Sequence, residues 1–140
     1  MVEVKGGKEF IEKVEYGKDL LGFIEDLVKK RRVKAGILTA IGAVQEAKIK
    51  YYDQKEKRYR SLRIDEPMEL LSCVGNVSTF EGDTIIHCHV VLGDKNGRAY
   101  GGHLDYGTRV FSCEMYLREF EGVGLKRKYD QITGLNLLDI

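Results

Sequence analysis

Apolar side chains recur at helical spacing in one segment of the chain, from Asp19 to about Arg32. The stripe consists of Leu20, Leu21, Ile24, Leu27 and Val28. Asp19 is a favourable N-cap, because its carboxylate accepts a hydrogen bond from a free backbone N–H of the first turn. The segment ends in four cations, which the negative end of the backbone dipole stabilises. The pattern therefore predicts one amphipathic helix.

Alternating or continuous apolar runs make up most of the remaining chain and predict strands. They cover Phe10–Val14, Ala35–Ala43, Ala47–Tyr52, Arg58–Ile64, Met68–Thr79, Ile85–Leu92, Arg98–Leu104 and Val110–Phe120. Short turns rich in Gly, Asp and Asn separate several of these runs, which favours hairpins and antiparallel pairing. We expect an α+β fold in which a mainly antiparallel sheet packs against one principal helix. Residues 1–140 are expected to form one domain, with the tail from Glu121 packed against the body or a neighbouring subunit.

Composition narrows the class of protein. The 140 residues include 43% hydrophobic residues, and 23 Lys and Arg balance 22 Asp and Glu to give a formal net charge of +1. No apolar run approaches the roughly 20 residues needed to cross a bilayer, and residues 1–5 do not resemble a signal peptide. We expect a cytoplasmic protein without a membrane partner. A domain that binds nucleic acid through its own surface usually shows a basic excess, which this chain lacks.

The cysteines do not suggest a disulfide framework. Cys73, Cys88 and Cys113 are odd in number and have no close spacing, and an odd count without a signal peptide argues against structural disulfides. All three lie in apolar or alternating segments, so we expect buried free thiols.

The three histidines of the chain fall within 17 positions. His87 and His89 share one face of a strand, because successive side chains alternate across it. Lys95-Asn96-Gly97 suits a three-residue hairpin loop that ends in a left-handed Gly. Residue 94 would then pair with residue 98, so that paired numbers add to 192 and His103 lies opposite His89. A loop shorter or longer by one residue would send His103 to the other face.

Three imidazoles on one face predict a site for a divalent cation, with zinc the expected ion. Three protein ligands leave a fourth position for water or another ligand, as in catalytic zinc sites. Asp105 is two residues beyond His103 and is predicted to orient an imidazole from behind the ligands. Iron, nickel, manganese and cobalt also bind imidazole sites. The alternative is a set of hydrogen-bonded histidines in a pocket or a subunit interface.

The histidine region resembles a known family, the plants and prokaryotes conserved domain, or PPC domain. The resemblance is carried by Ile86–Asp94, Gly97 and Ala99–Leu104, with further similarity over Met68–Asn76 and Ile41–Val44. It implies a mainly antiparallel sheet with packed helices and assembly as a homotrimer. It also points to the stand-alone prokaryotic type, whose members are described as DNA-binding-like without an established activity.

Plant members of this family carry the domain after AT-hook motifs in nuclear DNA-binding proteins. An AT-hook needs an R-G-R-P core, but the only proline here is Pro67, preceded by Asp65-Glu66. The DNA-binding role of the plant proteins therefore does not transfer by motif. The first hypothesis is a non-catalytic, trimeric metal-binding module with a DNA-binding-like or regulatory role, which implies DNA or a DNA-binding protein as a possible partner.

Basic runs supply the candidate nucleic-acid contacts. The principal candidates are Lys29, Lys30, Arg31 and Arg32, followed by Lys34, Lys55, Lys57, Arg58, Arg60, Arg63, Lys126, Arg127 and Lys128. Each run is also explained as a solvated face, and the first as the C-terminal end of the helix.

The second hypothesis is a metal-dependent enzyme of hydrolase or lyase type that acts on a small anionic substrate. A zinc-bound water becomes a nucleophile near neutral pH. Asp105, Glu81 and Glu114 are the candidate general bases. Arg98 and Arg109 are the candidates for holding the substrate. A third hypothesis is an assembly scaffold in which the metal joins subunits.

Overall fold

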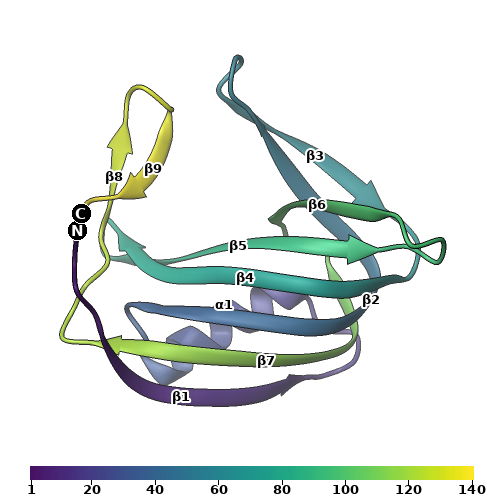
Figure 1. The fold of residues 1–140 in the computed structure, drawn as a ribbon, viewed down its shortest axis with the longest axis horizontal. Coiled ribbons are helices and arrows are strands. Elements are labelled where there is room, and N and C mark those ends of the chain that lie inside the picture. The colour runs from purple at the N-terminus through teal and green to yellow at the C-terminus, as the bar shows by residue number, and fades with distance from the viewer.

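The computed structural model describes residues 1–140, which form one helix and nine strands (Figure 1). The elements are β1 (Lys5–Val14), α1 (Leu20–Arg31), β2 (Gly36–Asp53), β3 (Arg58–Ile64), β4 (Met68–Phe80), β5 (Asp83–Gly93), β6 (Ala99–Leu104), β7 (Arg109–Glu121), β8 (Arg127–Asp130) and β9 (Leu135–Leu138). All pairings between these strands are antiparallel. The predicted α+β class is confirmed. The one helix is too short and too polar to cross a membrane.

Strand β2 is the centre of the sheet and pairs with four other strands. Its first half lies between β4 and β7, and its second half pairs with β3 and, at Ile49 and Lys50, with β6. The sequence predicted two separate strands here, and that prediction is wrong: β2 is one strand of 18 residues. Register shifts between Ala40 and Glu46 mark irregularities in the middle of the strand. Bulges of this kind bend a strand without ending it.

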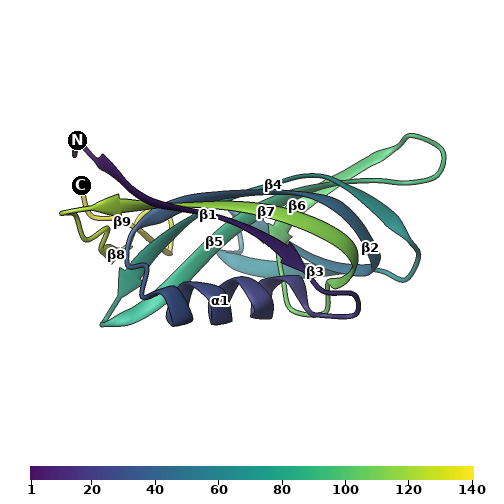
Figure 2. The same ribbon diagram turned by 90° about the horizontal axis from the view of Figure 1, so that it is seen from below.

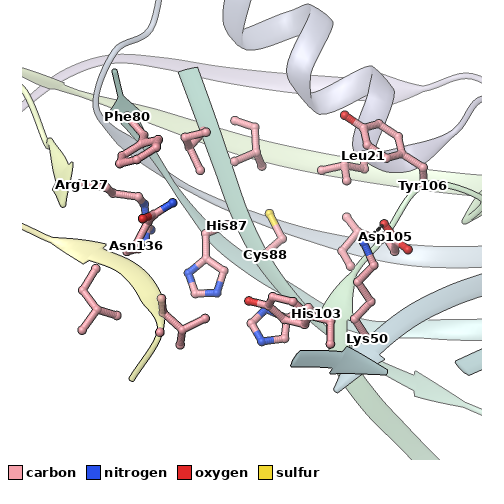
Figure 3. Close-up of a pocket in the computed structure, with 17 residues that line it drawn as sticks. Leu21, Lys50, Phe80, His87, Cys88, His103, Asp105, Tyr106, Arg127 and Asn136 are labelled. Atoms are coloured by element: carbon pink, nitrogen blue, oxygen red, sulfur yellow. Dashed lines mark hydrogen bonds and ion pairs between the residues drawn. The ribbon is translucent and has the colours of Figure 1, made fainter. Parts of the chain in front are cut away.

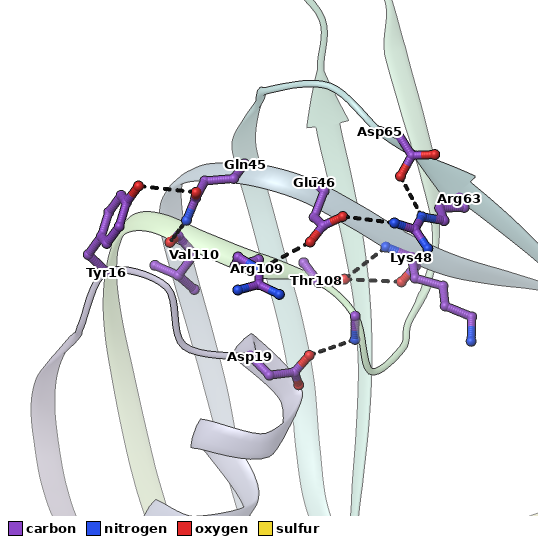
Figure 4. A network of polar contacts seen from close by, with 11 residues as sticks. Tyr16, Asp19, Gln45, Glu46, Lys48, Arg63, Asp65, Thr108, Arg109 and Val110 are labelled. Carbon is purple, nitrogen blue, oxygen red and sulfur yellow. Dashed lines mark hydrogen bonds and ion pairs between the residues drawn. The ribbon is translucent and has the colours of Figure 1, made fainter.

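Helix α1 covers one face of the sheet (Figure 2). Its predicted limits are confirmed, because Asp19 accepts a hydrogen bond from Gly22 N and Arg32 ends the helix in a left-handed conformation. The apolar stripe of α1 is buried in a core cluster of 24 residues. The Asp19 carboxylate also accepts a hydrogen bond from Gly107 N (Figure 4), so the start of α1 is fixed to the loop between β6 and β7.

The face of the sheet away from α1, called the outer sheet face below, is covered only at one end, where Arg127 of β8 is bonded to Ser78 and Asn76. Directly paired residues share a face, and the registers align Ile11, Tyr116, Thr39, Val74, His89 and His103 in one row across β1, β7, β2, β4, β5 and β6. The neighbouring inner row, by contrast, contains Leu38, Leu117 and Cys88 and is buried. All three cysteines are buried free thiols, as expected. The histidines therefore lie on the exposed side of the sheet.

The tail folds into the hairpin β8–β9, which lies at one end of the sheet near both termini (Figure 1). Thr79 N donates to Leu125 O, and Arg127 donates to Ser78 Oγ on β4. The predicted packing of the tail against the body is thus confirmed.

Gly102 lets β6 approach β2 closely. A Cβ atom at this position would lie 2.7 Å from the Lys50 carbonyl oxygen, closer than carbon and oxygen approach without a shift. Residue 103 pairs with Lys50 immediately beside this contact. The position of His103 therefore depends on a residue without a side chain at 102.

We expect Gly102→Ala to destabilise the chain by about 1–3 kcal/mol, the usual cost of overpacking, and to weaken metal binding by moving His103. Gly124→Ala is the control, because a Cβ atom at residue 124 would meet no other atom within 4 Å. Denaturant unfolding and metal titration of both variants measure the effects. Equal stability of the two variants would contradict the close-approach explanation.

Candidate metal centre

The β5–β6 hairpin brings the histidines together. Its loop has the expected three residues, with Gly97 at φ 77°, and Asp94 N donates to Arg98 O. The Asp94 carboxylate also accepts hydrogen bonds from Asn96 N and Arg98 N, which fixes the loop. His89 pairs with His103, as the register argument predicted. A local turn thus determines which face the third imidazole occupies.

The three imidazoles converge on the outer sheet face. One ring nitrogen from each of His87, His89 and His103 lies within 4.8 Å of the other two. The Nε2 atoms of His87 and His89 are 3.3 Å apart. Two nitrogens bound at the usual zinc distance of 2.0–2.1 Å in a tetrahedron are separated by roughly 3.3 Å. The spacing of this pair fits a zinc ion, and it also fits a hydrogen bond between neutral rings when no metal is bound.

The surroundings disfavour protonation of two of these imidazoles, those of His87 and His103. Burial lowers the pKa of His103 from 6.5 to about 4, and the neighbouring His89, His87 and Lys50 add to the effect. Burial also lowers the pKa of His87, assisted by the positive charge of Arg127. Neutral imidazoles present free lone pairs near pH 7, which is the form that binds a metal. The donor set of three nitrogens, without thiolate or carboxylate, suits zinc and related borderline-soft ions.

The Asp105 carboxylate forms ion pairs with two lysines. Lys50 Nζ lies 2.8 Å from its Oδ1, and Lys48 Nζ lies 3.4 Å from its Oδ2. Burial, the largest single influence, raises the pKa of Asp105, but the hydrogen bond and charge of Lys50, with Lys48, bring it below the ordinary value. No hydrogen bond joins this carboxylate to an imidazole, and its predicted role behind the ligands stays a prediction. Its structural partner is Lys50, which pairs with His103 across β2 and β6.

A model of the Plants and Prokaryotes Conserved domain matches residues 1–121 of this chain. The chain belongs to the PPC domain family. A metal-containing protein from Archaeoglobus fulgidus is 40% identical over 99% of this chain and 97% of its own, with a TM-score of 0.93. A plant- and prokaryote-conserved protein from Pyrococcus horikoshii is 33% identical over 100% of this chain and 98% of its own, with a TM-score of 0.93.

A curated relative, the bifunctional protein GlmU of a Synechococcus strain, is 28% identical over 120 residues. The match covers 84% of this chain but only 18% of that protein. This chain therefore corresponds to a small part of the GlmU protein.

A cleft of about 460 Å³ adjoins the histidines of this PPC domain (Figure 3). It opens beside β5, because β6 pairs with β5 only from His89 to Gly93 and leaves residues 83–88 bonded to β4 alone. His87 and His103 line the cleft, together with Arg127 and Asn136 from the tail hairpin. Tyr59 of β3 also lines it and packs edge-on against His103, with ring centroids 5.1 Å apart.

The other sequence-based candidates lie away from this cleft. None of Glu81, Glu114, Arg98 and Arg109 lines it, and Arg109 instead donates to Glu46 (Figure 4). The sequence names Arg127 only as a candidate for DNA contact. Its place in the cleft has no local sequence signal, because the fold alone brings Arg127 together with Asn76 and Ser78.

The cations at the end of α1 are exposed. Arg31 forms an ion pair with Glu12 at 3.0 Å and lies over the Phe10 ring, which fixes it to β1. Lys29, Lys30 and Arg32 take part in no ion pair. The arrangement is the one expected of cations that stabilise a helix end, and it leaves three of the four free for other contacts.

The metal-free PPC domain is expected to lose stability as the pH falls from about 6.5 toward 4. The pKa of His103 is lower in the folded chain than in the unfolded chain, so the unfolded chain binds more protons in this window and acid favours it. Thermal melting at pH 7 and pH 5 after metal removal measures the loss. His103→Asn should lose less than the unmodified chain over the same interval, and an equal loss in both would contradict the assignment.

Proposed function

We propose that this chain is a homotrimeric, non-catalytic metal-binding module of the PPC family, with zinc bound by His87, His89 and His103. The observation that carries the proposal is the convergence of three imidazoles, with two Nε2 atoms 3.3 Å apart. A relative 40% identical to this chain is named as a metal-containing protein, which supports metal binding by a chain of this fold. Zinc would supply a Lewis-acidic centre with a fourth position open to a ligand.

The environment of the site supports a binding role over catalysis. A zinc-bound water acts as a nucleophile most effectively when a base lies within reach of it. Asp105 is the only carboxylate among the residues of the cleft, and two lysines hold it. A metal-dependent hydrolase or lyase remains the alternative, and it would need a base from another subunit or from the substrate itself.

The outer sheet face supports the proposed homotrimer. Ile11, Ile41, Val74 and Val91 are exposed there, and contiguous apolar surface on a soluble domain commonly marks an interface. Val74 pairs with His89, so an interface on this face would extend to the metal centre. The trimer is also what the family resemblance implies.

Native mass spectrometry tests the metal and the assembly together. The unmodified chain, purified without an affinity tag and supplied with zinc, should give a trimer with one ion per chain. His87→Ala/His89→Ala should lose the metal, whereas Thr39→Ala, in the same row of the outer sheet face, should keep it.

The oligomeric state of the double variant separates two arrangements. A trimer without metal means that the interface stands on its own, as proposed. Dissociation into single chains would instead place the metal between subunits. A metal-free unmodified chain after zinc loading would overturn the metal-binding proposal.

Contact with DNA, directly or through a DNA-binding protein, is the second candidate function. Proteins of the same fold from Bacteroides thetaiotaomicron and Ralstonia eutropha are named as candidate DNA-binding proteins, although at 23% and 24% identity they inform on the fold alone. The favourable observation in this chain is the group of free cations at the end of α1, Lys29, Lys30 and Arg32.

Fluorescence anisotropy with duplex DNA at increasing salt tests this second function. Binding through these cations should weaken steeply with salt, and replacing all three with Gln should reduce the logarithmic slope by about 1 for each lost phosphate contact. The matched control replaces three exposed lysines outside the candidate contacts, Lys5, Lys8 and Lys95, with Gln. An equal change of slope in both triple variants would exclude a specific contact at the helix end.

A further inference from the structure

Arg127 is a half-buried cation without an acidic partner. Its Nε donates to Ser78 Oγ, its Nη1 to Asn136 O and its Nη2 to Asn76 Oδ1, at 2.7, 2.7 and 2.9 Å. All three acceptors are neutral, and no ion pair of the chain includes Arg127. A guanidinium has five N–H groups, so one remains on Nη1 and one on Nη2. Three bonds thus fix the group while two donors stay free.

The fixed guanidinium lies next to the metal ligands. Asn76, which holds Nη2, is directly paired with His87 across β4 and β5, and opposite residues of antiparallel strands are close neighbours. Arg127 and His87 line the same cleft (Figure 3). An anion bound in this cleft would lie among residues that include both the guanidinium and two of the metal ligands, His87 and His103.

With a metal ion bound, the cleft would carry excess positive charge, which favours binding of an anion. A divalent ion on three neutral imidazoles keeps its full charge of +2, because no ligand in the set is negative. Among the other residues of the cleft, Lys50 and Asp105 compensate one another and Arg127 is left over. Charged groups removed from water are stable when paired. The uncompensated charge at this end of the cleft is therefore entirely positive.

The remaining walls of the cleft are mostly apolar. They include Phe80 of β4, Ile85 and Ile86 of β5, and Leu135 and Leu137 of β9. A volume of about 460 Å³ falls in the range of small-molecule sites, which combine apolar walls with a few polar anchors. Inorganic phosphate would use the charged end only, whereas an organic anion would use both parts.

We propose that this cleft binds a small organic carboxylate whose carboxylate end lies between the metal and Arg127 and whose apolar body lies along β5 and β9. The proposal rests on the metal centre proposed above. It names a ligand class for that centre, and it assigns to Arg127 the role of an anion-binding residue. A fork of N–H donors matches the two oxygens of a carboxylate, which an ammonium group does not.

The experiment uses the full chain loaded with Co²⁺ in place of zinc, and follows the visible absorption bands of the cobalt ion. Benzoate is the probe, benzamide its neutral counterpart, acetate the carboxylate without an apolar body, and inorganic phosphate the anion of different chemistry. Benzoate should shift the bands with saturation, acetate should do so at least tenfold more weakly, and benzamide should cause no shift.

Variants assign the effect to Arg127. Arg127→Gln should weaken benzoate binding about tenfold or more, the loss expected for a charged hydrogen-bonding partner, and Arg127→Lys should restore it only in part. Lys128→Gln removes the adjacent exposed charge and should leave binding unchanged. Cobalt bands and thermal melting of each variant establish that the metal centre and the fold are intact.

The outcomes separate this proposal from the metal-binding function. Cobalt bands that benzoate does not shift, or a shift equal in the unmodified chain and Arg127→Gln, overturn the carboxylate site and leave the metal centre standing. Tighter binding of phosphate than of benzoate also overturns it, in favour of an inorganic anion. A chain that acquires no cobalt bands overturns the metal centre and this proposal with it.

Discussion

The pairing of one long strand with four others determines the architecture of this domain. The first half of β2 holds β4 and β7, and the second half receives β3 and β6. Because β6 ends on β2, the pairings of β2, β4, β5 and β6 form a closed circuit. Because β6 pairs with β5 only from His89 onward, residues 83–88 of β5 have β4 as their only paired strand. The irregular middle of β2 is thus linked to both the position of His103 and the existence of the cleft.

The candidate metal centre offers three ligands, none of them negatively charged. Burial keeps His87 and His103 unprotonated, so the site can bind a cation without first releasing protons near pH 7. The same absence of negative ligands leaves the charge of a bound ion uncompensated. Asp105 does not compensate this positive charge, because its carboxylate is ion-paired with Lys50 and Lys48. The chemistry that favours a metal here also favours an external anion.

The tail hairpin has a structural and a chemical role. Arg127 connects β8 with β4 and, through Asn136, with β9. These contacts fix the guanidinium in the cleft that His87 also lines. A residue that stabilises the tail thus also contributes charge to the site, because all of its fixed contacts are with neutral acceptors.

The sequence by itself determined the helix, most strands and the convergence of the histidines. Each of these follows from a local rule: the apolar period, the cap at Asp19, and a three-residue loop at Gly97 that sets the register of His89 and His103. Tertiary structure decided the rest. The continuity of β2, the lysine partners of Asp105 and the place of Arg127 depend on contacts between segments far apart in the chain, which no local period encodes.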